Sequence, residues 1–380
     1  MVSRRELLAG LGGITLVGVA GGTLFATTRT PHAALAPWQA PGTLATDPRV
    51  KAIEWAVLAP NPHNRQPWLV ELIGEDKALL RCDLERRLPA TDPFDRQILI
   101  GLGAFSELLI MAAQADGWNV TVTPFPDGAP SEAGRLDGRP IAHFKFSPGT
   151  GGTQDTLFSA VPLRRSHKEP FDDRGVTPAT VTQIGTLAGA PLGSTVEDGK
   201  VRQLKDLCME SWLIESSTPR THQESVDLMR IGKSEINANP DGIDLGGAFL
   251  ETLAMAGLLT RQTLADPNSQ AFASGKDIYE GLIGSAQGFI WSVTPTNTRA
   301  EQFRAGREWL RINLAATSLG VAVQPLSQAL QEYGEMTEPL RKVHALLGVE
   351  EPARIQMLAR IGYGPQVPPS PRWPAKTRII

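Results

Sequence analysis

The alternation of apolar and polar positions predicts a helix followed by a strand near the start of the chain. In the segment DPRVKAIEWAVLA, residues 47–59, apolar side chains recur at close to helical spacing. WLVELI, residues 68–73, is instead rich in strand-forming residues. The connection APNPHNRQPW, residues 59–68, combines prolines with neutral hydrogen-bonding side chains. Such a corner suits a polar, planar ligand edge, although a bare turn has the same composition.

Two patterns recur later in the chain and indicate internal duplication. The pattern V-x-x-I leading to A-P at residues 50–60 recurs at residues 181–191, an offset of 131. The pattern A-A-x-x-x-G followed by V-x-V-x-P at residues 112–124 recurs at residues 315–325, an offset of about 203. Because both recur in the same order, we predict two related α+β modules, residues 47–150 and 151–380.

The second module carries roughly 70 extra residues, which we place at about residues 201–293. This segment is predicted to form helices joined by the turn NPDG, residues 239–242, and to act as a lid beside a ligand site. The modules also differ in their polar motifs. Only the first has the NPHNRQPW corner, and only the second opens with LRRSHKEPF. We therefore expect an intramolecular pseudo-dimer in which each module supplies half of one site.

The N-terminus predicts export. Residues 1–30 combine the pair Arg4-Arg5 with an uncharged stretch of 20 residues, 7–26, like a twin-arginine signal. That route carries folded proteins, often with a cofactor inside. Ala34-Leu35-Ala36 resembles a cleavage site, but Pro37 disfavours processing, so residues 7–26 either are removed or remain as a membrane anchor. Residues 31–46 are interpreted as a linker.

Composition narrows the choice of function. The formal net charge is -3 and 20% of residues are charged, and no basic run is interleaved with aromatics, so nucleic acid is not expected as a partner. The two cysteines, Cys82 and Cys208, form no CxxC motif, and the six histidines show neither HxH nor HExxH spacing. Neither a metal site nor a disulfide framework is predicted.

Cations cluster at two places in the second module. Arg164, Arg165, Ser166 and Lys168 lie within five residues and would suit a phosphate through charge-assisted hydrogen bonds. Arg372, in VPPSPRWPAK, would be held by flanking prolines in an extended segment. The alternatives are a solvated basic turn and a partly disordered basic terminus.

No motif for a protein-derived nucleophile or a nucleotide fingerprint is found: GxGxxG in a βαβ context, a P-loop and GxSxG are all missing. The chemistry is therefore assigned to an organic cofactor, which the protein orients, and no catalytic side chain is predicted. The segment Pro325, Leu326, Ser327 and Gln328 follows a strand and would present backbone N–H groups to a ring edge, unless it is simply a strand-ending turn.

These motifs resemble a known family. PNPHNRQPW is similar to the PSSxNxQPW corner of nitroreductase-fold flavoproteins, and RRSHKEPF is similar to their RRSxR flavin-phosphate motif. ILIGLGAFSELLIMAAQADGW, ESVDLMRIGKSEI, NPDGIDL and RIGYGPQVPPSPRWP resemble the Acg branch, in which two nitroreductase modules are fused. The resemblance covers about residues 47–375 and implies an α+β, nitroreductase-like fold with one FMN per chain.

The resemblance also implies roles for individual residues. The phosphate side of FMN would be held by Arg164, Arg165, Ser166, Lys168 and Arg372. The corner would contribute Asn61, Pro62 and Asn64 near the ring and ribityl chain, and Pro325, Leu326, Ser327 and Gln328 would lie against the isoalloxazine. Arg230, in the lid, would approach the pyrimidine edge. Two positions depart from the pattern: Asn61-Pro62 replaces Ser-Ser, which removes a donor, and Lys168 replaces an arginine, which loses the fork geometry.

Three functions follow as hypotheses. The first is an exported, periplasmic FMN-dependent oxidoreductase that passes electrons in ping-pong order from a small-molecule donor to a nitro compound or quinone-like acceptor. The second is a flavin-binding or flavin-sequestering protein with a covered flavin and little turnover. The third is a structural protein whose flavin site has decayed. The chain would be a monomer, as a pseudo-dimer, or a homodimer.

Overall fold

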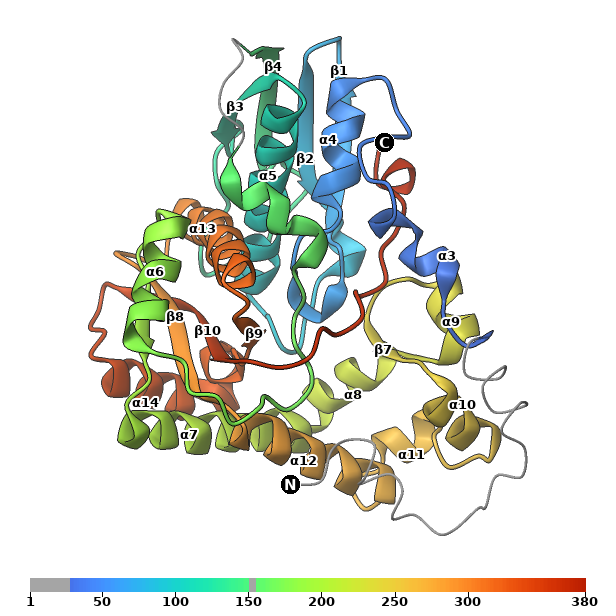
Figure 1. Ribbon diagram of the computed structural model, residues 1–380, viewed down its shortest axis with the longest axis vertical. Coiled ribbons are helices and arrows are strands. Elements are labelled where there is room, and N and C mark those ends of the chain that lie inside the picture. Colours follow the sequence, from blue (N-terminus) through green and yellow to red (C-terminus); the bar gives the residue numbers. More distant parts are fainter. Residues whose placement is uncertain (1–27, 150–154) are drawn as a thin grey trace.

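The computed structural model describes residues 28–149 and 155–380. The twin-arginine pair and the apolar stretch 7–26 lie outside the described residues. Two four-stranded antiparallel sheets organise the rest (Figure 1). The class is α+β, as predicted.

The first sheet has the strand order β1-β2-β4-β3. Its strands are β1 (Trp68–Ile73), β2 (Lys77–Cys82), β3 (Trp118–Pro124) and β4 (Ala142–Pro148). Burial alternates along β4, because one face packs on helices and the other faces solvent. Helix α4 (Pro48–Ala56) begins at the N-cap Asp47, whose side chain accepts from the Arg49 N–H. It packs, with η2 (Pro62–Asn64), on the central helix α5 (Arg96–Ala115).

The second sheet repeats this order as β5-β8-β10-β9. Its strands are β5 (Gly193–Thr195), β8 (Gly288–Thr294), β9 (Ala322–Pro325) and β10 (Arg354–Gly362). Strands β8 and β10 are buried along almost their whole length. Helix α13 (Arg299–Ser318) packs on this sheet and α6 (Pro178–Ala188) packs on α13, whereas a second apolar cluster joins the sheet to α7 (Asp198–Ser217) and α14 (Thr337–Leu347).

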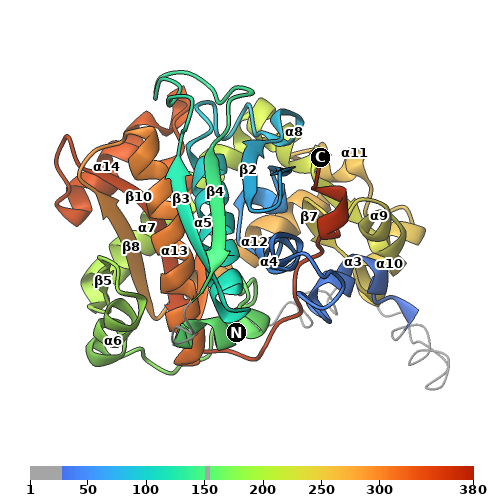
Figure 2. The same cartoon turned by 90° about the horizontal axis from the view of Figure 1, so that it is seen from above.

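The central helices α5 and α13 make the duplication visible, since every residue of α5 has a counterpart 203 positions later in α13. The helices pack against each other between the modules (Figure 2). They approach closely at two glycines: a Cβ on Gly103 would lie 2.1 Å from the Phe303 carbonyl oxygen. A Cβ on Gly306 would lie 2.0 Å from the Ile100 carbonyl oxygen.

Their first residues, Arg96 and Arg299, are fully buried, and each donates to carbonyls of the opposite module. Arg96 reaches Leu330 and Gln356, and Arg299 reaches Phe94 and Gly134. The two modules therefore share one interior.

The longest interruption of the duplicated order lies between β5 and β8. Strands β1 and β2 form a hairpin, whereas a long helical insertion separates their counterparts β5 and β8. After α7 it contains α8 (Pro219–Asp227), β6 (Met229–Ile231), α9 (Gly232–Ala238), β7 (Ile243–Leu245), α10 (Ala248–Met255), α11 (Arg261–Ala265) and α12 (Gln270–Gly284). We call this insertion the lid. Gly288–Thr294 belongs to the second sheet, so the lid ends earlier than residue 293.

The C-terminal segment crosses between the modules. It leaves β10, runs across the molecule and ends beside β1 (Figure 1). There the Val70 N–H donates to the Arg378 carbonyl at 2.8 Å, and the Ile380 N–H donates to the Val70 carbonyl at 2.9 Å. The last residues of the second module thus extend the first sheet.

The interpretation of residues 31–46 as a linker is wrong in one respect. Helix α3 (His32–Leu35) and the turn η1 (Ala36–Trp38) are packed on the protein, and Ala34 is buried. The Arg372 N–H donates to the Ala34 carbonyl at 2.8 Å. The proline-rich composition predicted a linker here. Composition indicates how the backbone can bend, but it does not show whether a segment packs against the rest of the protein.

Among the described residues, one helix is long and apolar enough to cross a membrane, α5. Its apolar window is 89% buried inside the protein, as expected of a core helix.

Candidate functional site

The corner after α4 is a strained turn held by its own amides. His63, Asn64 and Gln66 have left-handed backbones with φ of 45°, 51° and 52°. Asn61 accepts from the Gln66 N–H at 2.7 Å and donates to the Ala59 carbonyl at 3.2 Å. Asn61 therefore shapes the turn with both ends of its amide.

Two arginines from the second module meet this corner. Arg164 and Arg372 are 4% and 3% exposed, and each donates to the Leu58 carbonyl at 3.3 Å. Arg372 also donates to the Ala59 carbonyl at 3.2 Å and to the Asn64 side-chain oxygen. Asn64 in turn donates to the Pro371 carbonyl at 2.9 Å. The structure thus brings together the corner, the RRSHK loop and the C-terminal segment.

Among the described residues no carboxylate pairs directly with the guanidinium groups of Arg164, Arg165 and Arg372, and Asp244 attracts that of Arg372 only from a greater distance. Within residues 28–149 and 155–380, each retains a buried nitrogen without a hydrogen-bond partner: Nη1 of Arg164 and Nε of Arg165 and Arg372. Burial, with the neighbouring charges, lowers the pKa of Arg164 to about 10 and that of Arg372 to about 9. Buried cations with open donors are costly unless an anion pairs with them.

An aromatic ring completes this cluster. The guanidinium carbons of Arg165 and Arg372 lie 4.8 Å and 5.5 Å from the centroid of the Trp38 ring. The Trp38 Nε1–H donates to the Ser370 carbonyl at 2.9 Å, which fixes the ring. Trp38 was missed in the sequence because it lies in the segment interpreted as a linker.

The RRSHK loop is held beside the second sheet. The His167 N–H donates to the Val323 carbonyl of β9 at 3.0 Å. Arg360, fully buried in β10, donates to the carbonyls of His167 at 3.1 Å and Glu169 at 2.7 Å. No sequence motif marked Arg360, whose signal was only an arginine within an apolar strand.

Residues 325–328 lie at the end of β9. Leu326 is 2% exposed and its N–H donates to the Leu358 carbonyl at 2.9 Å, so its side chain belongs to the core. Pro325, Ser327 and Gln328 are half-buried, and Gln328 opens the turn η5 (Gln328–Leu330). The first N–H groups of such a turn have no hydrogen-bond partner within the turn.

Lys168 and Arg230 lie differently from the three clustered arginines. Lys168 is exposed and pairs with Asp244 of the lid at 3.6 Å. Arg230 pairs with the buried Asp241 at 2.8 Å. Ser166, half-buried, stands between Arg165 and His167 in the loop. In this structure Arg230 is engaged within the lid and does not join the cluster.

Asp241 fastens the lid to the corner. Besides Arg230, it pairs with Arg86 at 2.5 Å and Arg65 at 3.8 Å, both from the first module. Gln66 donates to the Pro240 carbonyl at 2.7 Å in the same turn. We call these contacts of the NPDG turn the lid latch. The sequence predicted the turn but not its partners, because they are distant in the chain.

His63 belongs to the same corner. Burial, with Lys168 and Arg65 nearby, lowers the pKa of His63 to about 4. It is therefore neutral at pH 7 and adds no charge to the corner.

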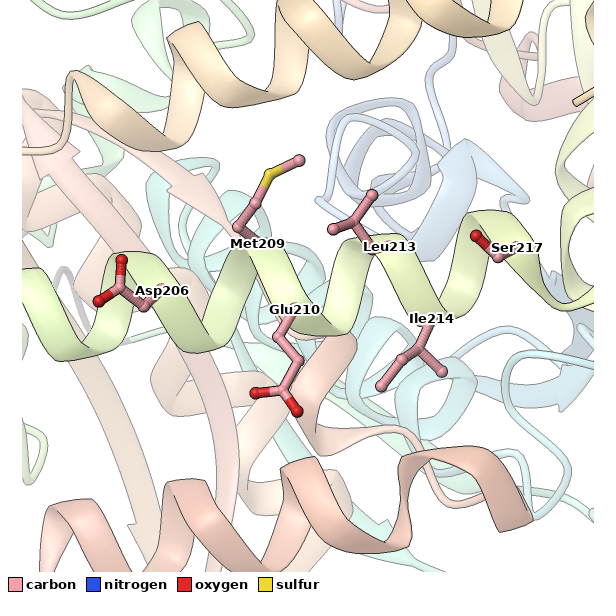
Figure 3. A pocket seen from close by; sticks show the side chains of 6 residues that line it. All are labelled: Asp206, Met209, Glu210, Leu213, Ile214 and Ser217. Carbon is pink, nitrogen blue, oxygen red and sulfur yellow. The ribbon is translucent and has the colours of Figure 1, made fainter. Parts of the chain in front are cut away.

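Two other features, a pocket and the cysteines, lie apart from the arginine cluster. A shallow pocket of about 620 Å³ on α7 is lined by Asp206, Met209, Glu210, Leu213, Ile214 and Ser217 (Figure 3). These residues include no cation and lie outside the arginine cluster. Cys82 and Cys208 are separate buried thiols, and among the described residues no group of side chains is arranged to hold a metal ion.

Comparison with known proteins shows what the chain is similar to. The chain is 27% identical over 345 residues to a Mycobacterium tuberculosis protein whose name, Acg NAD(P)H nitroreductase, is itself provisional; the match covers 88% of this chain and 96% of the relative. It is also 27% identical over 348 residues to an uncharacterized protein of the same organism, covering 85% of this chain and 90% of that relative. Over most of its length the chain is thus similar to these two proteins. No protein-family model matches it.

Solved nitroreductases overlap with the chain only in part. The FMN-dependent nitroreductase NfnB of Mycobacterium smegmatis, solved in complex with NADPH, matches with 19% identity and a TM-score of 0.32. The overlap covers 53% of this chain and 84% of that chain.

Proposed function

We propose that the chain binds one FMN between its two modules and acts as an oxidoreductase of nitroreductase type. The observation that carries the proposal is the cluster of Arg164, Arg165 and Arg372, which combines buried, unpaired donors with no carboxylate partner among the described residues. A phosphate monoester supplies the acceptors and the negative charge that such a cluster lacks.

The remaining residues fit the rest of a flavin. Asn61 and Asn64 hold the shape of the corner, and its backbone and Pro62 would face the ring. The N–H groups at Ser327 and Gln328 would meet the ring edge, and Ser166 and Lys168 would support the phosphate side. When bound, FMN would supply the redox chemistry, taking electrons from a donor and passing them in ping-pong order to a nitro compound or quinone-like acceptor. Similarity to Acg-like homologues supports this reading.

A second function is favoured by the lid latch. Asp241 and Pro240 are bound by Arg86, Arg65 and Gln66, so that the lid is fastened over the corner by buried contacts. A latched lid would cover a flavin and restrict substrate, which fits a flavin-binding or sequestering protein with little turnover. The third hypothesis, a decayed site, is disfavoured because decay does not preserve a costly buried cation cluster.

One experiment separates these functions. Protein purified with FMN is reduced by dithionite or NAD(P)H under anaerobic conditions, and a nitroaromatic or quinone is then added. Rapid reoxidation by the acceptor supports the oxidoreductase. Flavin that is retained but reacts slowly with donors and acceptors supports sequestration, and a colourless protein contradicts both.

Export is part of the proposal and rests on Arg4-Arg5 and the apolar stretch 7–26. In that location NAD(P)H is not expected to be the donor. Changing both arginines to lysine should retain the protein in the cytoplasm, which cell fractionation detects. Export that survives this change would contradict a twin-arginine route.

A further inference from the structure

Residues 31–38 are tied to two parts of the protein around the arginine cluster. The Ala34 carbonyl accepts from the Arg372 N–H at 2.8 Å, and the Ala34 N–H donates to the side-chain oxygen of Asn237 in the lid at 3.1 Å. The Trp38 Nε1–H donates to the Ser370 carbonyl at 2.9 Å. The segment next to the proposed export signal is therefore docked against both the C-terminal segment and the lid.

Trp38 also places an electronegative group, its indole ring, beside arginines that have no carboxylate partner in the described part of the chain. Arg165 and Arg372 carry like charges, have no carboxylate partner there, and both lie against the Trp38 ring. The face of an indole is electronegative and attracts a guanidinium most strongly where water is excluded. Arg372 is almost fully buried, so the ring adds to the oxygens of Asn64, Leu58 and Ala59 in compensating its charge.

We propose that Trp38 is a positioning residue of the anion site, and that docking of residues 31–38 and binding of the cofactor's phosphate favour each other. The ring holds Arg165 and Arg372 side by side, with their open N–H groups free for an anion. A chain whose N-terminal segment is held elsewhere then binds the phosphate weakly, and a bound phosphate stabilises the docked segment by the same factor. This inference rests on the proposed function.

Substitution of Trp38 tests the inference when FMN is compared with riboflavin, which lacks the phosphate. In full-length protein, Trp38→Leu keeps apolar bulk and removes the π face, whereas Trp38→Phe keeps an aromatic face. Flavin fluorescence titration should show that Trp38→Leu weakens FMN binding by about tenfold, the scale of one desolvated cation–π contact. Riboflavin affinity should be unchanged, and Trp38→Phe should retain most of the FMN affinity.

Trp373 is a matched control. Arg86 and Arg378 lie 5.4 Å and 5.5 Å from its ring, but these arginines are paired with Asp241 and Asp83. Trp373→Leu should therefore change FMN and riboflavin affinities by the same factor. If Trp38→Leu does likewise, Trp38 is merely structural and the inference is wrong.

A second measurement is independent of flavin. Inorganic phosphate should raise the melting temperature of the wild-type protein, and this shift should shrink in Trp38→Leu. Wild-type protein that binds no flavin but shows this difference would contradict the proposed function and leave the inference intact for the anion. An equal phosphate shift in both proteins would overturn the inference.

Discussion

Arg372 donates to the side chain of Asn64 across 308 positions of the chain. The bond joins the C-terminal segment of the second module to the corner of the first, and Asn64 returns a hydrogen bond to the Pro371 carbonyl. Because Arg164 approaches the same corner through Leu58, the two modules converge on one cationic site.

Replacing an arginine of the cluster should weaken FMN binding and increase the stability of the protein without ligand. Arg164 is buried, beside Arg165 and without an ion-pair partner among the described residues. Arg164→Met should raise the free energy of unfolding without ligand, by about 1 kcal/mol, because an uncompensated buried charge is replaced by apolar packing. The same change should abolish most of the stabilisation by FMN, which is about 2.7 kcal/mol at 100 times Kd for an intact site. Denaturant titrations with and without FMN measure both effects.

Arg174→Met is the control for this trade. Arg174 is exposed and paired with Asp172 at 2.9 Å, so neither stability nor FMN binding should change measurably. Loss of stability without ligand in Arg164→Met, together with unchanged FMN binding, would show that Arg164 is structural.

Breaking the lid latch should open the site. Asp241→Asn leaves Arg65, Arg86 and Arg230 without their shared carboxylate, and breaking a buried ion pair typically costs about 3–5 kcal/mol. We expect faster proteolysis within the lid and faster release of FMN. Glu335→Gln, which breaks the exposed pair with Arg220, should change neither rate. Equal FMN release from wild type and Asp241→Asn would show that the lid does not limit access.

His63 should make stability depend on pH. Its pKa is lowered from 6.5 to about 4, so the unfolded chain takes up a proton first as pH falls. The free energy of unfolding should therefore decrease from pH 6.5 down to about pH 4 and lose no more to this group below that. His63→Asn, which tolerates the left-handed backbone, should lack this component. If the free energy of unfolding, measured by denaturant titration, changes with pH in the same way in both proteins, His63 does not contribute this pH dependence.

The crossing of α5 and α13 should not tolerate a methyl group. Gly103→Ala places Cβ 2.1 Å from the Phe303 carbonyl oxygen, and overpacking of this kind costs about 1–3 kcal/mol or more. Gly275→Ala, in α12, meets no atom within 4 Å and should instead stabilise by about 0.5–1 kcal/mol. Thermal unfolding of both variants checks this, and a harmless Gly103→Ala would mean that the modules pack less closely.

The sequence predicted the features that depend on repetition and local pattern. The offset of 203 residues marked α5 and α13, and the change from helical to strand-like pattern marked α4 and β1. The α+β class follows from these patterns. The asymmetric motifs also indicated which segments meet, since the corner and Arg164 share the Leu58 carbonyl.

What the sequence did not predict are long-range contacts of residues without a motif. Trp38 lay in a segment that composition marked as a linker, and Arg360 and Asp241 act through partners far away in the chain. Arg230 was expected near a flavin because of a resemblance, but in this structure its ion pair with Asp241 directs it to the lid latch. Charge alone does not indicate which carboxylate a cation meets.

The central claim is that the two modules clasp one FMN between a cationic cluster and a neutral corner. The most direct measurement is the absorbance spectrum and flavin stoichiometry of purified wild-type protein after incubation with FMN and gel filtration, beside the double variant Arg164→Gln and Arg372→Gln. The account predicts an oxidised-flavin spectrum with about one FMN per chain in the wild type and almost none in the variant, which should remain folded. Colourless wild-type protein, or a variant that retains FMN equally well, would contradict it.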